Sequence, residues 1–160
     1  MRAKNITEGA IGEMKFVVEY SHIGHVVNVL QKLKLKGLKS IHRSRLKDSL
    51  MQHLERVSKE EKELKDQYAK KDENDEPILK ELDDGRKVYD IENMEEFNKA
   101  FNEFYKEKVV IDGGDSQVFL KSVKASVEES EVEWSGQESD YFAYTYEAFQ
   151  EDKKENEDDE

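Results

Sequence analysis

Two heptad-patterned segments separated by an Asp-Gly turn constrain the fold of this chain more than any other feature. In residues 44–71, apolar side chains recur at alternating spacings of three and four, interrupted only by Glu61: Leu50, Leu54, Val57, Leu64 and Tyr68. Residues 93–106 repeat the spacing with Met94, Phe97, Phe101 and Phe104. Such stripes predict helices that pack along one face. We therefore expect a helix–β-hairpin–helix arm with two antiparallel helices.

A β-hairpin is expected between these helices because Asp84-Gly85 is a favoured two-residue hairpin turn. This turn predicts three cross-strand pairs: Ile78 with Ile91, Lys80 with Tyr89, and Leu82 with Lys87. Pro77 and the polar residues before it forbid continuation of the first helix. Asn93 is a suitable N-cap for the second helix.

The residues before the arm give weaker patterns. For residues 1–20 a helix is favoured, and a strand through residues 15–20 is the alternative because Phe16-Val17-Val18 favours β structure. Residues 26–36 are expected to form a basic amphipathic helix that ends at Gly37, since glycine is common in left-handed C-terminal caps. Residues 38–43 are expected to connect this helix to the long one.

Beyond the arm, a short strand is expected at residues 109–111. A helix is expected from Asp115 or Ser116, with this core face: Val118, Leu120, Val123 and Val127. Val132 and Trp134 alternate with glutamates, which predicts an extended segment that pairs with residues 109–111. Ser135-Gly136-Gln137-Glu138 has the form of a capping box and predicts a last helix to about residue 150.

The composition agrees with a thin core and long solvated helices. Only 36% of the residues are apolar and 40% are charged, against about 45–50% and about 25% in ordinary domains. The expected fold is mainly α with a minor β component. Its helix–β-hairpin–helix arm (residues 44–106) stands on a small helical base (residues 21–43 and 107–150). Residues 1–150 are expected to form one domain, and residues 151–160 a disordered acidic tail.

Several functional classes are disfavoured by what the sequence lacks. The chain has no cysteine, which excludes disulfides and thiolate chemistry and favours a reducing compartment. It has neither a signal-peptide pattern nor a long apolar run, so a soluble intracellular protein is expected. His22-x-x-His25 lacks the companion ligands of a metal motif, and no catalytic constellation stands out. We expect no enzyme activity, no metal and no cofactor.

The net charge of −12 conceals a basic segment. Residues 32–56 carry eight Lys or Arg against two acidic residues, whereas residues 57–160 carry 15 basic and 33 acidic residues. The candidate partner-binding residues are Lys32, Lys34, Lys36, Lys39, Arg43, Arg45 and Lys47, and His42 lies in the same basic segment. The favoured partner is a protein, including the acidic arm of the same or another subunit. Nucleic acid is the alternative, although no aromatic residue for base stacking lies in this segment.

The last expected helix carries aromatic side chains on more than one side. Together with the preceding tryptophan, the candidate partner-binding surface comprises Trp134, Tyr141, Phe142, Tyr144 and Tyr146. Aromatic residues are enriched at protein interfaces. Coverage of these rings by the rest of the domain explains the same pattern, and both interpretations stay open at this point.

Several short motifs of the chain resemble those of a known family. They are Leu33-Lys34-Leu35-Lys36-Gly37, Ser40-x-x-Arg43-x-Arg45-Leu46 before the acidic heptad helix, Val109-Val110-Ile111-Asp112-Gly113-Gly114, and Ser135-Gly136-Gln137-Glu138 with Tyr141, Ala148 and Phe149. Over residues 26–150, the chain resembles small proteins encoded by temperate tailed bacteriophages (siphophages) of Gram-positive bacteria, in or near the tail-to-lysis gene region. The resemblance implies a phage origin, expression in the infected bacterium and a late or accessory role. It implies no site residues, because the family has no established activity.

The expected function is that of a non-enzymatic bacteriophage accessory protein acting through protein–protein contacts. It would serve virion or tail-module assembly, or inhibit a host or anti-phage defence factor. The alternatives are a nucleic-acid-binding module that uses residues 32–47 and an acidic DNA mimic that blocks a host nuclease. A homo-oligomer is expected because heptad stripes and a thin core leave apolar surface to cover. The expected location is the cytoplasm of the infected host or the virion, without membrane contact.

Overall fold

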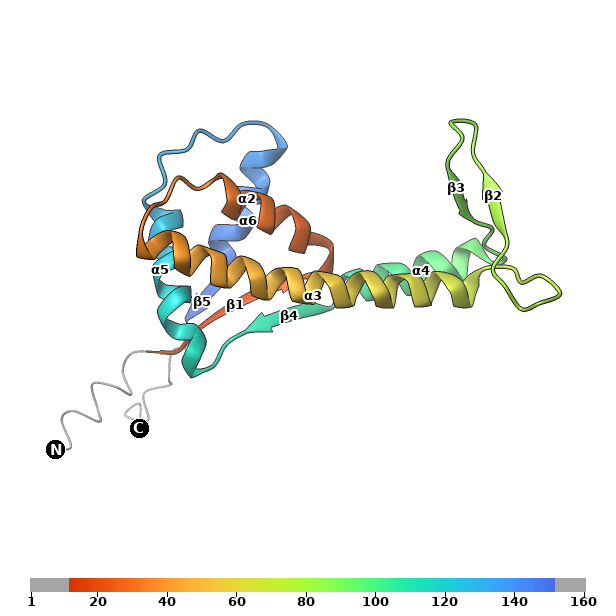
Figure 1. The fold of residues 1–160 in the computed structure, drawn as a ribbon, viewed down its shortest axis with the longest axis horizontal. Coiled ribbons are helices and arrows are strands. Elements are labelled where there is room, and N and C mark those ends of the chain that lie inside the picture. The colour runs from red at the N-terminus through yellow and green to blue at the C-terminus, as the bar shows by residue number, and fades with distance from the viewer. Residues whose placement is uncertain (1–11, 152–160) are drawn as a thin grey trace, which may run out of the picture.

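The computed structural model describes residues 12–151, which form a base and a protruding arm (Figure 1). The base contains β1 (Met14–Glu19), η1 (Tyr20–His22), α2 (Ile23–Lys32), β4 (Lys108–Ile111), η2 (Gly114–Ser116), α5 (Gln117–Glu128), α6 (Gln137–Ala148) and β5 (Phe149–Glu151). The long helix α3 (Leu38–Tyr68) begins on the base and continues into the arm, together with β2 (Leu79–Glu81), β3 (Lys87–Tyr89) and α4 (Met94–Tyr105). The prediction of a mainly α fold with a minor β component is confirmed.

The base is built on a three-stranded antiparallel sheet in the order β4-β1-β5. In the central strand, Phe16 pairs with Ile111 on one side and with Phe149 on the other. Side chains from the sheet, from the helices of the base and from the first half of α3 form one core, whose fully buried members include Phe16, Val18, Ile23, Leu30, Leu46, Leu50, Leu120 and Val123. Val57 is the last residue of α3 that this core buries.

Residues 14–19 form strand β1, so the helix favoured for residues 1–20 is wrong over this stretch. Alternate side chains of β1, those of Met14, Phe16 and Val18, are buried. The strand is favoured because β4 and β5 pair with both of its edges and satisfy its backbone. These partners come from the second half of the chain, which a local pattern does not reveal. Residues 1–11 lie outside the described part.

Gly37 begins a helix instead of ending one. Helix α2 ends at Lys32, after which Leu33 is buried in the core. Gly37 has a positive φ of 66° and directly precedes Leu38, the first residue of α3. The predicted connection over residues 38–43 is therefore wrong, because these residues are helical. The positive φ that favours glycine is present, but it serves the turn that starts α3.

In the arm, α4 lies beside the outer half of α3 and is held there by aromatic side chains (Figure 1). The rings of Tyr68 and Phe97 meet edge to face at 5.8 Å, and Phe97 lies 4.4 Å from Phe101. At the root of the arm, Tyr20 of the base meets Phe104 at 5.3 Å. The two heptad stripes thus meet within one chain, through half-buried rings.

Glu61, the polar position of the first stripe, has partners inside the arm. Its carboxylate accepts a hydrogen bond from the Tyr105 hydroxyl and lies 2.8 Å from the Lys65 ammonium. Burial, and after it this hydrogen bond, raises the pKa of Tyr105 well above its ordinary value. The phenol therefore remains a hydrogen-bond donor at physiological pH.

The hairpin differs from its predicted register by one residue. The observed pairs are Leu79 with Tyr89, Lys80 with Val88, and Glu81 with Lys87. Gly85, at a φ of 85°, donates its N–H to the carbonyl of Leu82, and Leu82 donates to the carbonyl of Arg86. This makes a three-residue loop where a two-residue turn was expected, and the extra residue shifts the register. Ile78 and Tyr89, predicted to share a face, consequently lie on opposite faces.

Two predictions for the segment after the arm need correction. Val118, expected in the core, is 61% exposed, and Phe119 occupies the buried face of α5 instead. Val132 and Trp134 form no strand, and β4 pairs with β1 instead of with them. The strand predicted at residues 109–111 is confirmed as β4. Its hydrogen-bonding partner is β1.

The last helix starts and ends differently from its prediction. Gly136, with a φ of 58°, is the N-cap of α6, and no side chain caps this helix end, so the capping box at Ser135 is wrong. Helix α6 ends at Ala148, and residues 149–151 join the sheet as β5. Glu151, predicted to start a disordered tail, is thus paired with Met14. Residues 152–160 lie outside the described part.

Candidate functional site

The basic residues gather where α2 passes into α3, at the end of the base farthest from the hairpin (Figure 1). We call this region, residues 32–47, the basic corner. It contains seven Lys or Arg and no acidic residue. The loop between the two helices and the first turns of α3 hold its charges in place.

Three cations of the basic corner have intramolecular partners. Lys32 binds the carboxylate of Glu138 on α6, and Lys39 lies 3.5 Å from that of Glu129 at the end of α5. Arg43 donates hydrogen bonds to the carbonyl oxygens of Leu33 and Leu30, the latter at 3.4 Å. Since these carbonyls terminate α2, Arg43 caps that helix and fixes the angle between α2 and α3.

The other cations of the basic corner are available to a partner. Lys34, Lys36 and Arg45 are exposed, and none of them forms an ion pair with another residue of the described range 12–151. Lys47 is half-buried. His42 faces inward, is 7% exposed, and its Nδ1 has no hydrogen-bond partner among the described residues. His42 therefore belongs to the inner face of α3 and not to the charged surface.

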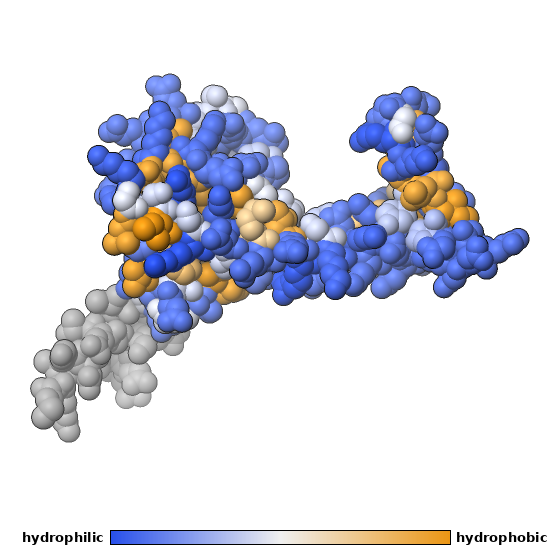
Figure 2. All heavy atoms as spheres, viewed as in Figure 1, coloured by the Kyte–Doolittle hydropathy of each residue, from blue (hydrophilic) through white to orange (hydrophobic). Residues whose placement is uncertain are grey.

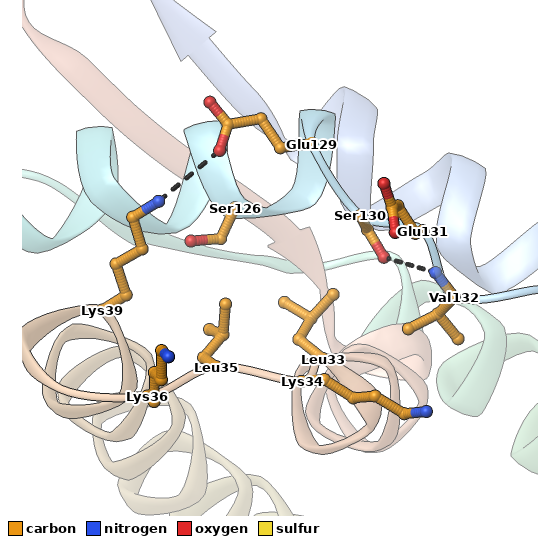
Figure 3. A pocket seen from close by; sticks show the side chains of 10 residues that line it. All are labelled: Leu33, Lys34, Leu35, Lys36, Lys39, Ser126, Glu129, Ser130, Glu131 and Val132. Atoms are coloured by element: carbon orange, nitrogen blue, oxygen red, sulfur yellow. Dashed lines mark hydrogen bonds and ion pairs between the residues drawn. The ribbon is translucent and has the colours of Figure 1, made fainter.

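A groove of about 500 Å³ opens beside these cations (Figure 3). Its lining is Leu33, Lys34, Leu35, Lys36, Lys39, Ser126, Glu129, Ser130, Glu131 and Val132. Leu33 and Leu35 point across the groove toward the end of α5, and Lys39 reaches Glu129 on the far side (Figure 3). The groove thus combines apolar side chains with charges of both signs. Such a lining suits a polypeptide better than a uniform polyanion.

The aromatic residues of the last helix mostly pack against the base, where they are half-buried. Tyr141 stacks on His25 with ring centroids 3.8 Å apart, and Tyr144 stacks on His22 at 4.0 Å. The Tyr144 hydroxyl accepts a hydrogen bond from the backbone N–H of Glu19 at 2.9 Å. Burial raises the pKa of Tyr144, which stays a neutral phenol.

Of the remaining aromatic candidates, Trp134 and Phe142 pack on each other and Tyr146 is exposed. Trp134 stacks on Phe142 with centroids 5.0 Å apart, and the Lys32 ammonium lies 5.5 Å from the Trp134 ring. Tyr146 is about half exposed and lies outside these stacks. Most residues of the candidate aromatic surface thus lie at the contact between α2 and α6. Of the five candidates, Tyr146 is the exposed one.

The stacked histidine–tyrosine pairs were missed by sequence reasoning. A signal for them exists, because His22-x-x-His25 and Tyr141-x-x-Tyr144 share one helical spacing and therefore match ring for ring when the helices pack. Within residues 12–151 no group of three or more potential ligands is placed to hold a metal ion. The two histidines serve packing here. No helix in that same range has the length and apolarity needed to cross a membrane.

The far end of the arm carries the opposite charge to the basic corner. We call this region, residues 70–96, the acidic tip; it holds eleven Asp or Glu against five Lys or Arg. Figure 2 shows an apolar patch where the hairpin joins the two arm helices. The large apolar residues exposed in this region are Ile78, Leu79 and Met94. The acidic tip is therefore an exposed surface with both apolar and acidic character.

Comparisons with known proteins place the chain in a family without giving it an activity. No curated protein and no solved structure matches the chain. A family model does match, from residue 14 to residue 156, which spans the whole base and the arm. The chain belongs to the family described as protein of unknown function, DUF1617.

Proposed function

We propose that this protein is a bacteriophage accessory protein that works by binding another protein through the basic corner, and not by catalysis. The observation that carries the proposal is a set of exposed cations, Lys34, Lys36 and Arg45, that form no ion pair within residues 12–151. Lys34 and Lys36 line the groove of mixed apolar and charged character. Such cations favour an acidic partner, and the half-buried Leu35 in the groove provides the apolar contact that a protein interface needs.

A protein suits this surface better than a nucleic acid does. Three of its seven cations are already bound within the chain, and Glu129 and Glu131 in the groove repel phosphate. Residues 32–47 contain no Phe, Tyr or Trp on which a base would stack, and the imidazole of His42 is buried. The net charge of −12 further opposes the approach of a polyanion.

The motifs at residues 33–46, 109–114 and 135–149 support a phage origin, since they resemble those of siphophage proteins. The protein would then act in the cytoplasm of the infected bacterium or in the virion. Two roles fit a binding protein of this kind, namely virion or tail-module assembly and inhibition of a host or defence factor. An acidic DNA mimic that blocks a host nuclease is a second candidate, which the charge of the acidic tip favours.

Affinity purification from infected cells tests the proposal. The corner variant Lys34→Glu/Lys36→Glu/Arg45→Glu is expected to lose the proteins that the wild type captures, by about tenfold or more, since like charges across an interface are strongly unfavourable. A matched control, Lys99→Glu/Lys106→Glu/Lys108→Glu, makes the same charge change at exposed positions outside the basic corner. Equal capture by both variants, or capture that nuclease treatment abolishes, would contradict binding of protein by the corner.

A further inference from the structure

The acidic tip of a molecule does not reach its own basic corner. Helix α3 has 31 residues, which corresponds to about 45 Å of rigid helix. The basic corner lies at its first turns and the acidic tip lies beyond its last turn (Figure 1). A contact between these two regions therefore needs two molecules.

The two regions are complementary in charge. The basic corner has seven cations and no acidic residue, and the acidic tip has a surplus of carboxylates. Lys34, Lys36 and Arg45, which form no ion pair within residues 12–151, are all exposed. On the acidic tip, Glu73, Glu76 and Glu81 are exposed as well. Opposite fields of this kind steer two surfaces together and fix their relative orientation.

The two regions also match in apolar character. Leu38 and Ile41, in the first turns of α3, are both more than half exposed. At the acidic tip, Leu79 and Met94 are exposed to a similar degree. Exposed large apolar residues that are rimmed by charges are typical of interaction sites. Each region therefore offers exposed apolar residues that are close in sequence to exposed charged residues.

We propose that the acidic tip of a second copy of this chain occupies the basic corner, in a two-fold dimer with the two α3 helices antiparallel. This inference rests on the proposed function, for which it names the partner. In each copy, helix α3 sets the distance between the basic corner and the acidic tip. Two copies with antiparallel α3 helices can therefore form two corner–tip contacts at the same time. A two-fold axis also closes the assembly at two chains.

The mass of the purified wild-type protein is the first test. Light scattering at tens of micromolar in low salt is expected to give twice the 18.8 kDa mass of the chain. Raising the salt concentration is expected to shift the mass toward the monomer, because exposed charges are screened. A monomer in low salt, or a ladder of larger masses, would overturn the two-fold dimer.

A charge exchange identifies the surfaces. The corner variant Lys34→Glu/Lys36→Glu/Arg45→Glu and a tip variant, Glu73→Lys/Glu76→Lys/Glu81→Lys, change only exposed residues. Each variant alone is expected to dimerise about tenfold or more weakly, because both of its contacts become repulsive. An equimolar mixture is expected to dimerise again, since each mixed contact joins opposite charges. A mixture that stays monomeric would overturn the proposal.

A substitution that leaves charge unchanged gives an independent test. Leu79→Thr at the acidic tip is expected to weaken the dimer, whereas Val110→Thr on β4 is expected to leave it unchanged. These residues are 52% and 48% exposed, both lie in strands, and threonine suits a strand. Equal effects of the two substitutions would count against the acidic tip. These assays use purified protein alone, so a partner captured from infected cells still tests the proposed function separately.

Discussion

Leu46→Ala is expected to lower the free energy of unfolding by about 2–5 kcal/mol, the cost of emptying a fully buried leucine site. Leu46 is 0% exposed and joins α3 to the core of the base. Because α3 also carries the arm, loss of this contact affects both parts of the molecule. Urea titration is the measurement, with the fluorescence of Trp134, the sole tryptophan, as the probe.

The matched control for this prediction lies one turn further along the same helix. Met51 is 45% exposed, and Met51→Ala is expected to cost less than about 1 kcal/mol because most of its surface is already in water. Equal losses of stability for the two substitutions would mean that α3 does not present Leu46 to the core.

Phe97→Ala is expected to loosen the arm without unfolding the base. No residue of α4, all of which the structure describes, is fully buried, so half-buried rings hold this helix against α3. Phe97 contacts both Tyr68 and Phe101. Its removal is expected to cost about 1–3 kcal/mol of local stability, which raises amide exchange in α4 roughly ten- to a hundredfold.

Hydrogen exchange followed by mass spectrometry separates this local effect from a global one. Exchange is expected to rise in α4 and to stay unchanged in α5 of the base, whose core residues do not touch Phe97. Asn102→Ala is the control, since Asn102 is exposed on the same helix and lies outside the acidic tip. Faster exchange in α5 would show that arm and base unfold as one unit.

The parts of the fold that the sequence predicts correctly depend on local signals. The heptad stripes place both arm helices, and Asn93 caps α4 as expected, with its side chain accepting a hydrogen bond from the N–H of Glu96 at 3.2 Å. Pro77 and the polar residues before it forbid helix at their own positions, as expected. Helix α3 stops earlier, at Tyr68, where Ala69 becomes extended and pairs with Ile91. Signals of this kind act within a few residues and need no knowledge of the tertiary structure.

The errors in the fold arise where distant residues decide the local structure. Strand β1 starts where the Gln117 amide donates to and accepts from the backbone of Met14, each at 2.7 Å. No pattern in the first twenty residues predicts that Gln117 of α5 binds Met14. The hairpin register likewise depends on a single additional loop residue, since Asp-Gly fits both a two-residue turn and the observed loop.

The basic residues of the candidate site could be picked out from the sequence, but their partners within the fold could not. The basic segment is recognisable from composition, and the structure gathers it at one corner. The roles of Arg43 as a helix cap and of Lys39 as a partner of Glu129 depend on the angle between α2 and α3. The sequence therefore indicates where charge accumulates, and the fold decides which charges remain available for a partner.

A cross-linking experiment tests most directly the claim that the acidic tip of one copy meets the basic corner of another. The chain has no cysteine, so single cysteines introduced at exposed positions label one site each. A Lys36→Cys protein mixed with a Lys80→Cys protein is expected to form a mixed dimer with a short bismaleimide. Lys106→Cys, on the arm outside the acidic tip, is the control partner. Selective linkage of residues 36 and 80 between two chains is the predicted result. Equal yields with the control, or efficient linkage of residues 36 and 80 within one dilute doubly substituted chain, would contradict the claim.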